Sequence, residues 1–212
     1  AFADLARASP PGGSYFLFTF VVLVAWNLFS FTLSKTSFSL VGNSYLVSKV
    51  YFPRLILPLS GTLSTLLDFA VALAVYVVLL AFQGSAPPVL VLLLPVWITL
   101  ILCLALGAGF IAATLTVKYR DIQHILPIVI PFLLYASPVA YDVSQIPVRY
   151  QTVFYLVNPL AALIAGMRAS LVPGGALPPL AFVSWSAAVP LGLFASRAAV
   201  FKRKERSFAD VV

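Results

Sequence analysis

The chain has 212 residues, of which 62% are hydrophobic and only 9% are charged, and its mean hydropathy is +1.06. A soluble domain of this length needs far more polar surface, so the composition excludes a soluble globular protein. The formal net charge of +7 does not indicate nucleic-acid binding, because the basic residues flank apolar runs, where they set orientation in a membrane. With a single histidine (His124) and a single cysteine (Cys103), the chain has no His pair, no intramolecular disulfide and no thiolate metal cluster.

The N-terminal segment, residues 1–14, lacks the basic start and apolar run of a signal peptide. It begins with Ala1, and we expect it to lie inside a longer protein. The first apolar run follows directly, and its other end leads into the loop that is assigned to the cytoplasm below. We therefore assign residues 1–14 to a loop on the outer face of the membrane.

Apolar runs long enough to cross a bilayer recur along the chain and predict an all-α polytopic membrane protein. The first run is about 28 Å long as a helix, close to the hydrocarbon thickness of about 30 Å. We expect a single transmembrane domain over residues 1–212, with spans at 15–33, 55–82, 89–117, 122–141 and 180–201.

The stretch VKYRDIQH, residues 117–124, interrupts two of these runs with three charges. Each would cost about 2.5–3.5 kcal/mol at the centre of a span, so the stretch must be an elbow in water. The positive-inside rule then makes the elbow, the loop 34–54 and the tail 202–212 cytoplasmic. The basic residues on this side are Lys35, Lys49, Arg54, Lys118, Arg120, Arg197, Lys202, Arg203, Lys204 and Arg206, against Arg7, Arg149 and Arg168 on the other.

The apolar stretch 153–172 cannot be a full span under this assignment, because it would carry the basic tail to the outer side. We expect it to enter and leave at the outer face as two half-helices broken at Asn158-Pro159, since proline disfavours helix at the residue before it. The outer re-entrant region then covers residues 142–179. Tyr135, Tyr141, Phe154 and Tyr155 gather near it, where they either line a passage or serve ordinary packing.

The loop 34–54 has apolar residues at spacings of three to five and predicts a short amphipathic helix that ends near Pro53. Such a helix either lies on the lipid surface or docks on a cytoplasmic partner. Asp121 either interacts with the dipole of the helix that follows it or contacts that partner. Asp68, deep in a span, is expected to be a buried polar residue, either a proton site or a hydrogen-bonded helix contact. Pro127, Pro131 and Pro138 weaken one span, as a hinge or as static curvature.

Four blocks of sequence resemble one family of membrane proteins. NSYLVSKVYFPRLILPLSG, KYRDIQHILPIVIPFLLYASPVAY, YLVNPLAALIAGMR and FKRKERSFADVV are similar, in order and spacing, to the permease subunit of ABC-2 type polysaccharide exporters. Members of that family export O-antigen, teichoic acid or capsule chains across the bacterial cytoplasmic membrane. They also have an interfacial helix and a first span before the region present here, so the five runs would be spans two to six.

The resemblance implies a homodimer that works with two ATPase subunits and threads a lipid-linked glycan between its two copies. ATP and magnesium would bind the ATPase, and this chain, which has no G-x-x-x-x-G-K-[ST] loop, would hold no cofactor. Its ATPase-coupling residues would be Asn43, Tyr45, Lys49, Tyr51, Phe52, Arg54, Lys118, Tyr119, Arg120 and Asp121. Its glycan path and gate would include Tyr135, Tyr141, Phe154, Tyr155, Asn158 and Pro159.

The sequence leaves other functions open. An ABC-2 exporter of drugs or lipids would share the topology. The blocks that contain FPR (residues 52–54) and YRD (residues 119–121) match such exporters less well. An intramembrane glycosyl- or acyltransferase needs clustered acids or histidines at membrane depth, and the chain offers one aspartate at that depth, Asp68. Secondary transport is disfavoured because no internal repeat is evident. We therefore predict a permease and not an enzyme.

Overall fold

A computed structural model of the chain describes residues 15–43, 45, 55–84, 86, 88–119, 121–137, 147–175 and 177–204. Every regular element within these residues is a helix, which confirms the predicted all-α class. In chain order the elements are α2 (Tyr15–Gly42), α4 (Ile56–Phe82), the 3-10 helix η1 (Val89–Leu93), α5 (Leu94–Lys118), α6 (Ile122–Ala136), α7 (Val148–Val157), α8 (Pro159–Leu171) and α9 (Leu180–Lys204).

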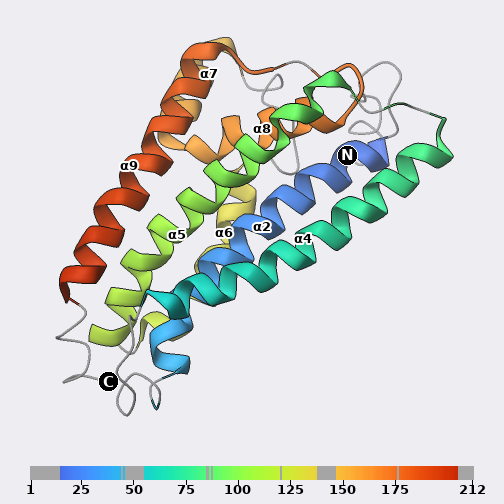
Figure 1. Ribbon diagram of the computed structural model, residues 1–212. Coiled ribbons are helices and arrows are strands. Elements are labelled where there is room, and N and C mark those ends of the chain that lie inside the picture. The colour runs from blue at the N-terminus through green and yellow to red at the C-terminus, as the bar shows by residue number, and fades with distance from the viewer. Residues whose placement is uncertain are drawn as a thin grey trace.

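The long helices form a bundle of membrane-spanning length (Figure 1). Within the described residues, four segments are long and apolar enough to cross a bilayer: α2, α4, η1 with α5, and α9. The expected span at 122–141 differs, because α6 has only 15 residues, about 22 Å of helix against about 30 Å of hydrocarbon. The remaining residues of that expected span, except Ser137, lie outside the described part of the chain.

Two helix ends differ from the sequence-based boundaries. Residues 34–42, expected in the cytoplasmic loop, continue α2. Two of their hydroxyl groups bond back to the helix itself: Ser37 Oγ donates to the Leu33 carbonyl at 2.6 Å and Ser39 Oγ to the Thr36 carbonyl at 2.7 Å. Thr36 Oγ1, by contrast, is buried without a hydrogen-bond partner among the described residues. At the other terminus, α9 continues to Lys204 and includes the first residues of the expected tail.

The bundle has two opposite ends. The first, here called the basic end, holds the helix termini Gly42, Ile56, Lys118, Ile122 and Lys204. An apolar cluster gathers segments from this end of four helices. It joins Leu40 of α2, Phe110 and Ala113 of α5 and Phe201 of α9, with Leu55 and Leu57 before and within α4 packed against it. The loop at residue 43, the elbow and the end of α9 therefore share one end, as the sequence analysis required.

The far end of the bundle holds Tyr15, Phe82, Leu94, Ala136 and Leu180. The chain runs from the far end to the basic end in α2, α5 and α9, and back in α4 and α6 (Figure 1). Helix α2 lies at the centre and contacts α4, α5, α6 and α8. It approaches α5 closely at Gly109, where an added Cβ would lie 2.5 Å from Thr36 Cγ2.

Candidate functional site

The helix pair α7 and α8 is broken at Asn158 and bends by 101°. Asn158 has φ −118° and ψ 87°, outside the helical region, and Pro159 opens α8 at its first position, where its missing N–H leaves no helical bond unmade. The break predicted from the Asn158-Pro159 dipeptide is confirmed.

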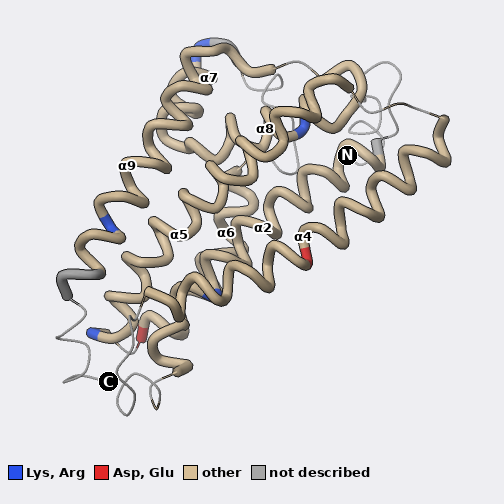
Figure 2. Tube along the Cα trace, viewed as in Figure 1, with Lys and Arg blue, Asp and Glu red and all other residues tan. Residues whose placement is uncertain are grey.

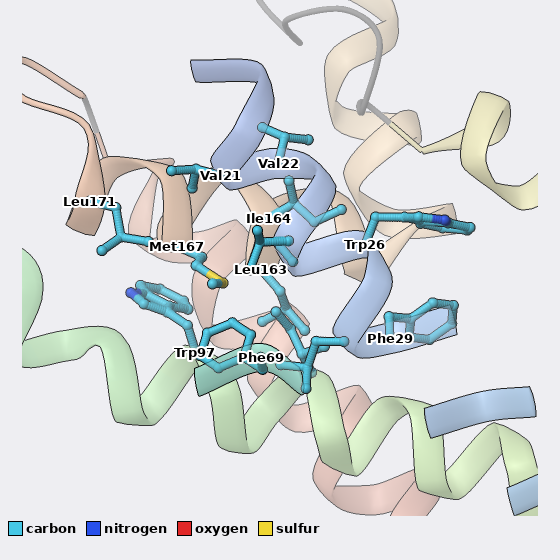
Figure 3. Close-up of a cluster of buried hydrophobic side chains, with 14 of the residues drawn as sticks. Val21, Val22, Trp26, Phe29, Phe69, Trp97, Leu163, Ile164, Met167 and Leu171 are labelled. Carbon is cyan, nitrogen blue, oxygen red and sulfur yellow. The ribbon is translucent and has the colours of Figure 1, made fainter. Parts of the chain in front are cut away.

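Helix α8 packs into the core of the bundle, and 11 of its 13 residues are buried. Figure 3 shows Leu163, Met167 and Leu171 of α8 in one apolar cluster with Trp97 of α5. Trp97 Nε1 donates to Ser170 Oγ at 2.9 Å. The non-helical backbone of a helix break requires protein around it at membrane depth. Helix α8, which follows the break at Asn158, is surrounded by protein.

The end of α8 is held by a second long-range hydrogen bond. Tyr76 Oη, on α4, donates to the Leu171 carbonyl at 2.7 Å. That carbonyl belongs to the last turn of α8, where no helical N–H is available to it. Arg168 in the same turn lies over the Phe18 ring of α2, with 4.6 Å from its guanidinium carbon to the ring centroid.

Helix α7 is fixed against α6 and α9. Tyr155 is buried and stacks on Phe182 with ring centroids 4.6 Å apart, and Trp185 Nε1 donates to the Leu156 carbonyl at 3.2 Å. Asn158 Nδ2 lies 3.1 Å from both the Ala136 carbonyl and Ser137 Oγ, at the end of α6.

These contacts place the broken pair at one end of the bundle. Phe18, Tyr76, Trp97, Phe182 and the end of α6 all lie toward the far end of their helices. Both ends of the pair therefore contact the far end of the bundle, which is the arrangement that the predicted re-entrant pair requires.

The predicted gate aromatics occupy different environments. Tyr135 is 69% exposed, whereas Tyr155 is buried against Phe182 and Phe154 lies edge-on to Tyr155 with centroids 6.3 Å apart. Only Tyr135 among these three presents an open ring in this structure, and Tyr155 serves packing. Tyr141 lies outside the described residues.

The predicted coupling residues that are described lie at the basic end. Asn43 Nδ2 donates to the Ser39 carbonyl at 2.9 Å and so closes the last turn of α2. Tyr45 is 72% exposed. Lys118 Nζ lies 5.1 Å from the centroid of the Tyr119 ring, and both side chains are exposed. The predicted coupling residues Lys49, Tyr51, Phe52, Arg54 and Arg120 fall outside the described part of the chain.

Asp121 stands at the N-cap position of α6, and its backbone carbonyl accepts from the N–H groups of His124 and Ile125 at 3.0 and 3.1 Å. Its exposed carboxylate makes no capping hydrogen bond. The charge therefore meets the positive end of the helix dipole and also remains accessible to water.

Lys35 is a residue that the sequence analysis misplaced. It lies seven residues before the end of α2, about 10 Å from the basic end. Its Nζ donates to Ser64 Oγ of α4 at 2.8 Å and lies 3.7 Å from Asp68 Oδ2. The expected helix contact of Asp68 is thus an ion pair, but its expected burial is wrong, because the Asp68 side chain is 66% exposed. The positions Leu33, Thr36, Ser37 and Leu40, all buried, carry the helical period that could have shown this extension of α2.

Among the residues that the structure describes, no three His, Cys, Asp or Glu side chains lie close enough together to hold a metal ion. The features that remain are mechanical: a broken helix pair at the far end and an exposed, charged elbow at the basic end.

Comparison with known proteins agrees with this arrangement. An O-antigen export system permease protein RfbA from Myxococcus xanthus is 27% identical over 212 residues, which are 100% of this chain and 80% of that protein. Two proteins of the same name from Klebsiella pneumoniae are 29% and 26% identical over 73% and 76% of this chain. The chain spans 60% and 62% of their lengths, less than two thirds. Residues 3–172 match the model of the ABC-2 type transporter family, and the chain therefore belongs to that family.

Proposed function

We propose that the chain is the permease subunit of an ATP-driven exporter of lipid-linked polysaccharide. It would be a multi-pass protein of the bacterial cytoplasmic membrane. The relatives reported above are O-antigen export permeases by name. These 212 residues carry no phosphate-binding loop for ATP, so the energy would come from a partner or an ion gradient, and the resemblance favours a separate ATPase.

The observation that carries the proposal is the division of the bundle into two unlike ends. The basic end presents Lys118, Tyr119 and Asp121 to water, as a surface that a cytoplasmic motor can push. The far end holds the broken pair around Asn158, as a closure that can separate the conduit from the outside. In the proposed assembly two copies of the chain pair with two ATPases, and the glycan passes between the copies.

Deletion in the native host tests the proposal. We expect surface polysaccharide to disappear while complete, lipid-linked chains accumulate inside, because synthesis continues without export. Accumulation of short, incomplete chains would instead indicate an intramembrane transferase. A phenotype limited to drug sensitivity, with normal surface polysaccharide, would indicate a small-molecule exporter.

Charge reversal tests the coupling surface. Arg54→Glu and Arg120→Glu should each reduce export and leave membrane insertion intact, because both residues are predicted to face the ATPase. Arg149→Glu is the matched control, since Arg149 is exposed on α7, away from the basic end. Unchanged export by both test variants, or an equal loss in the control, would remove the two arginines from the coupling role.

A further inference from the structure

Helix α2 exposes one narrow stripe between residues 17 and 41. Leu23, Asn27, Phe31 and Lys35 are exposed, and every other residue in that interval is buried or half-buried. Residues four apart lie on nearly the same side of a helix. The stripe is therefore a continuous line about 18 Å long that mixes an amide, an aromatic ring and a cation.

Helix α4 supplies the facing wall. Lys35 is linked to Ser64 and Asp68 of α4, and the Asp68 side chain nonetheless remains 66% exposed. A groove of about 180 Å³ opens between the two helices. It is lined by Asn27 and Phe31 of α2 and by Thr65, Asp68 and Phe69 of α4, among others.

The depth of this groove excludes lipid as its neighbour. Asp68 lies 12 residues from the start of α4 and 14 from its end, roughly 18–21 Å from either. Figure 2 shows acidic colouring about midway along α4, and Asp68 is the single acidic residue of that helix. A carboxylate so exposed at mid-span cannot be left in hydrocarbon, since ionisable groups in spans face protein or water-filled cavities. The α2–α4 face must therefore line water or meet protein.

The chemistry of the groove favours a sugar. A carboxylate and a carboxamide together accept from and donate to hydroxyl groups, and Phe31, which is 48% exposed, offers a flat apolar ring for the C–H face of a pyranose. The carboxylate repels a phosphate group at the same place. The volume is below the roughly 300–1,000 Å³ of pockets for drug-sized ligands, which suits one ring at a time.

We propose that the groove formed by Asn27, Phe31 and Asp68 is a binding site for single sugar units of the passing glycan, halfway across the membrane. Lys35 is a positioning residue that holds the Asp68 carboxylate against α4. This inference rests on the proposed function, because it names a wall of the conduit. The competing neighbours are a second copy of the chain and the first span that the resemblance places before this region, but charged residues are depleted from the buried centre of protein interfaces.

Cysteine accessibility tests whether the groove faces water. In a Cys103→Ser background, Asn27→Cys and Ala70→Cys form a matched pair, since both exposed positions lie 12 residues from the far end of their helix. Ala70 points to the opposite side of α4 from Asp68, because two residues turn a helix by about 200°. A membrane-impermeant thiol reagent should modify Asn27→Cys about tenfold faster or more, since only a hydrated thiol ionises and reacts.

Accumulated lipid-linked glycan should slow modification of Asn27→Cys and leave Ala70→Cys unchanged. Equal rates at the two positions would overturn the proposal, because the groove would then not be distinct from the lipid-facing surface. Ready disulfide formation between two copies through Asn27→Cys would also overturn it and show an interface between copies.

Export by substituted proteins separates sugar binding from helix packing. Asp68→Asn retains hydrogen bonding to hydroxyl groups and should therefore lose less export than Asp68→Leu, and Phe31→Tyr, which keeps an aromatic ring, should lose less export than Phe31→Ala. The double variant Lys35→Met with Asp68→Leu removes the ion pair without leaving a charge unpaired, so it should fold and insert but lose most export.

Full export by that double variant would mean that Lys35 and Asp68 serve packing alone, and this result would contradict the proposal. Loss of export in Asp68→Asn as severe as in the double variant would also contradict it, because the charge and not hydroxyl binding would then matter. If the unsubstituted protein exports no polysaccharide, it is the proposed function that fails, so the two failures remain distinguishable.

Discussion

Substitution of Gly166 by alanine tests how closely α8 is packed into the bundle. A Cβ at this position would lie 2.6, 2.7 and 2.8 Å from Cη2, Cζ2 and Cε2 of the Trp97 indole. Ordinary contact begins at 3.4 Å, so the two helices would have to separate locally by about 0.8 Å, and overpacking of this kind costs about 1–3 kcal/mol. The indole is not free to turn away, because its Nε1 is bonded to Ser170.

The matched control is Gly192→Ala on α9, where a Cβ would meet nothing within 4 Å. Alanine is a better helix former than glycine by about 0.8–1.0 kcal/mol, so this variant should be as stable as the original or slightly more stable. The two substitutions are chemically identical and should shift stability in opposite directions. The measurement is the midpoint temperature at which protein heated in detergent loses its monodisperse chromatographic peak.

A double-mutant cycle with Trp97→Phe assigns the penalty to this contact. Phenylalanine lacks the outer edge of the indole, so Gly166→Ala should cost less in the Trp97→Phe background than in the original protein. The loss of the bond to Ser170 occurs in both arms and cancels. An additive result, or a Gly166→Ala variant as stable as Gly192→Ala, would refute the close packing of α8 on α5.

Three further outcomes follow from the two ends of the bundle. Asn158→Ala removes two hydrogen bonds between the helix break and the end of α6, and we expect it to destabilise the protein by about 1–3 kcal/mol in the same heating assay. Topology reporters fused after residues 118 and 204 should report the same compartment, and opposite compartments would contradict the shared basic end. Pro131→Ala restores a backbone donor inside α6 and should raise stability; reduced export in this variant would identify a hinge, and unchanged export would leave static curvature.

The break at Asn158-Pro159 could be predicted from sequence because its cause is local. Proline restricts the residue before it and fits the first turn of the helix after it, and both effects act within two positions. What holds α8 in place could not be predicted. Tyr76 and Leu171 are 95 residues apart and Trp97 and Ser170 are 73 apart, and a single sequence carries no signal that pairs them.

The misplaced Lys35 shows how a correct rule fails for a physical reason. Serine, threonine and lysine in SKTSFS raise the polarity of residues 34–39, so a hydropathy reading ends the span before them. The rule assumes that polar side chains need water, whereas Ser37 and Ser39 bond to carbonyls of α2 and Lys35 bonds to α4. The cost of burial is thus largely offset inside the protein, and the helix continues.

Helix α6 connects the two ends directly. Its N-cap residue is Asp121, in the exposed elbow. Its C-cap residue is Ser137, which accepts a hydrogen bond from Asn158 at the break. None of its residues is buried, and Pro127 and Pro131 each remove a backbone donor from its interior. Packing stabilises a helix more than propensity does, so displacement of α6 would disrupt little buried packing. A displacement imposed at the elbow would therefore reach the broken pair through α6, while α8 stays fixed in the core by Trp97.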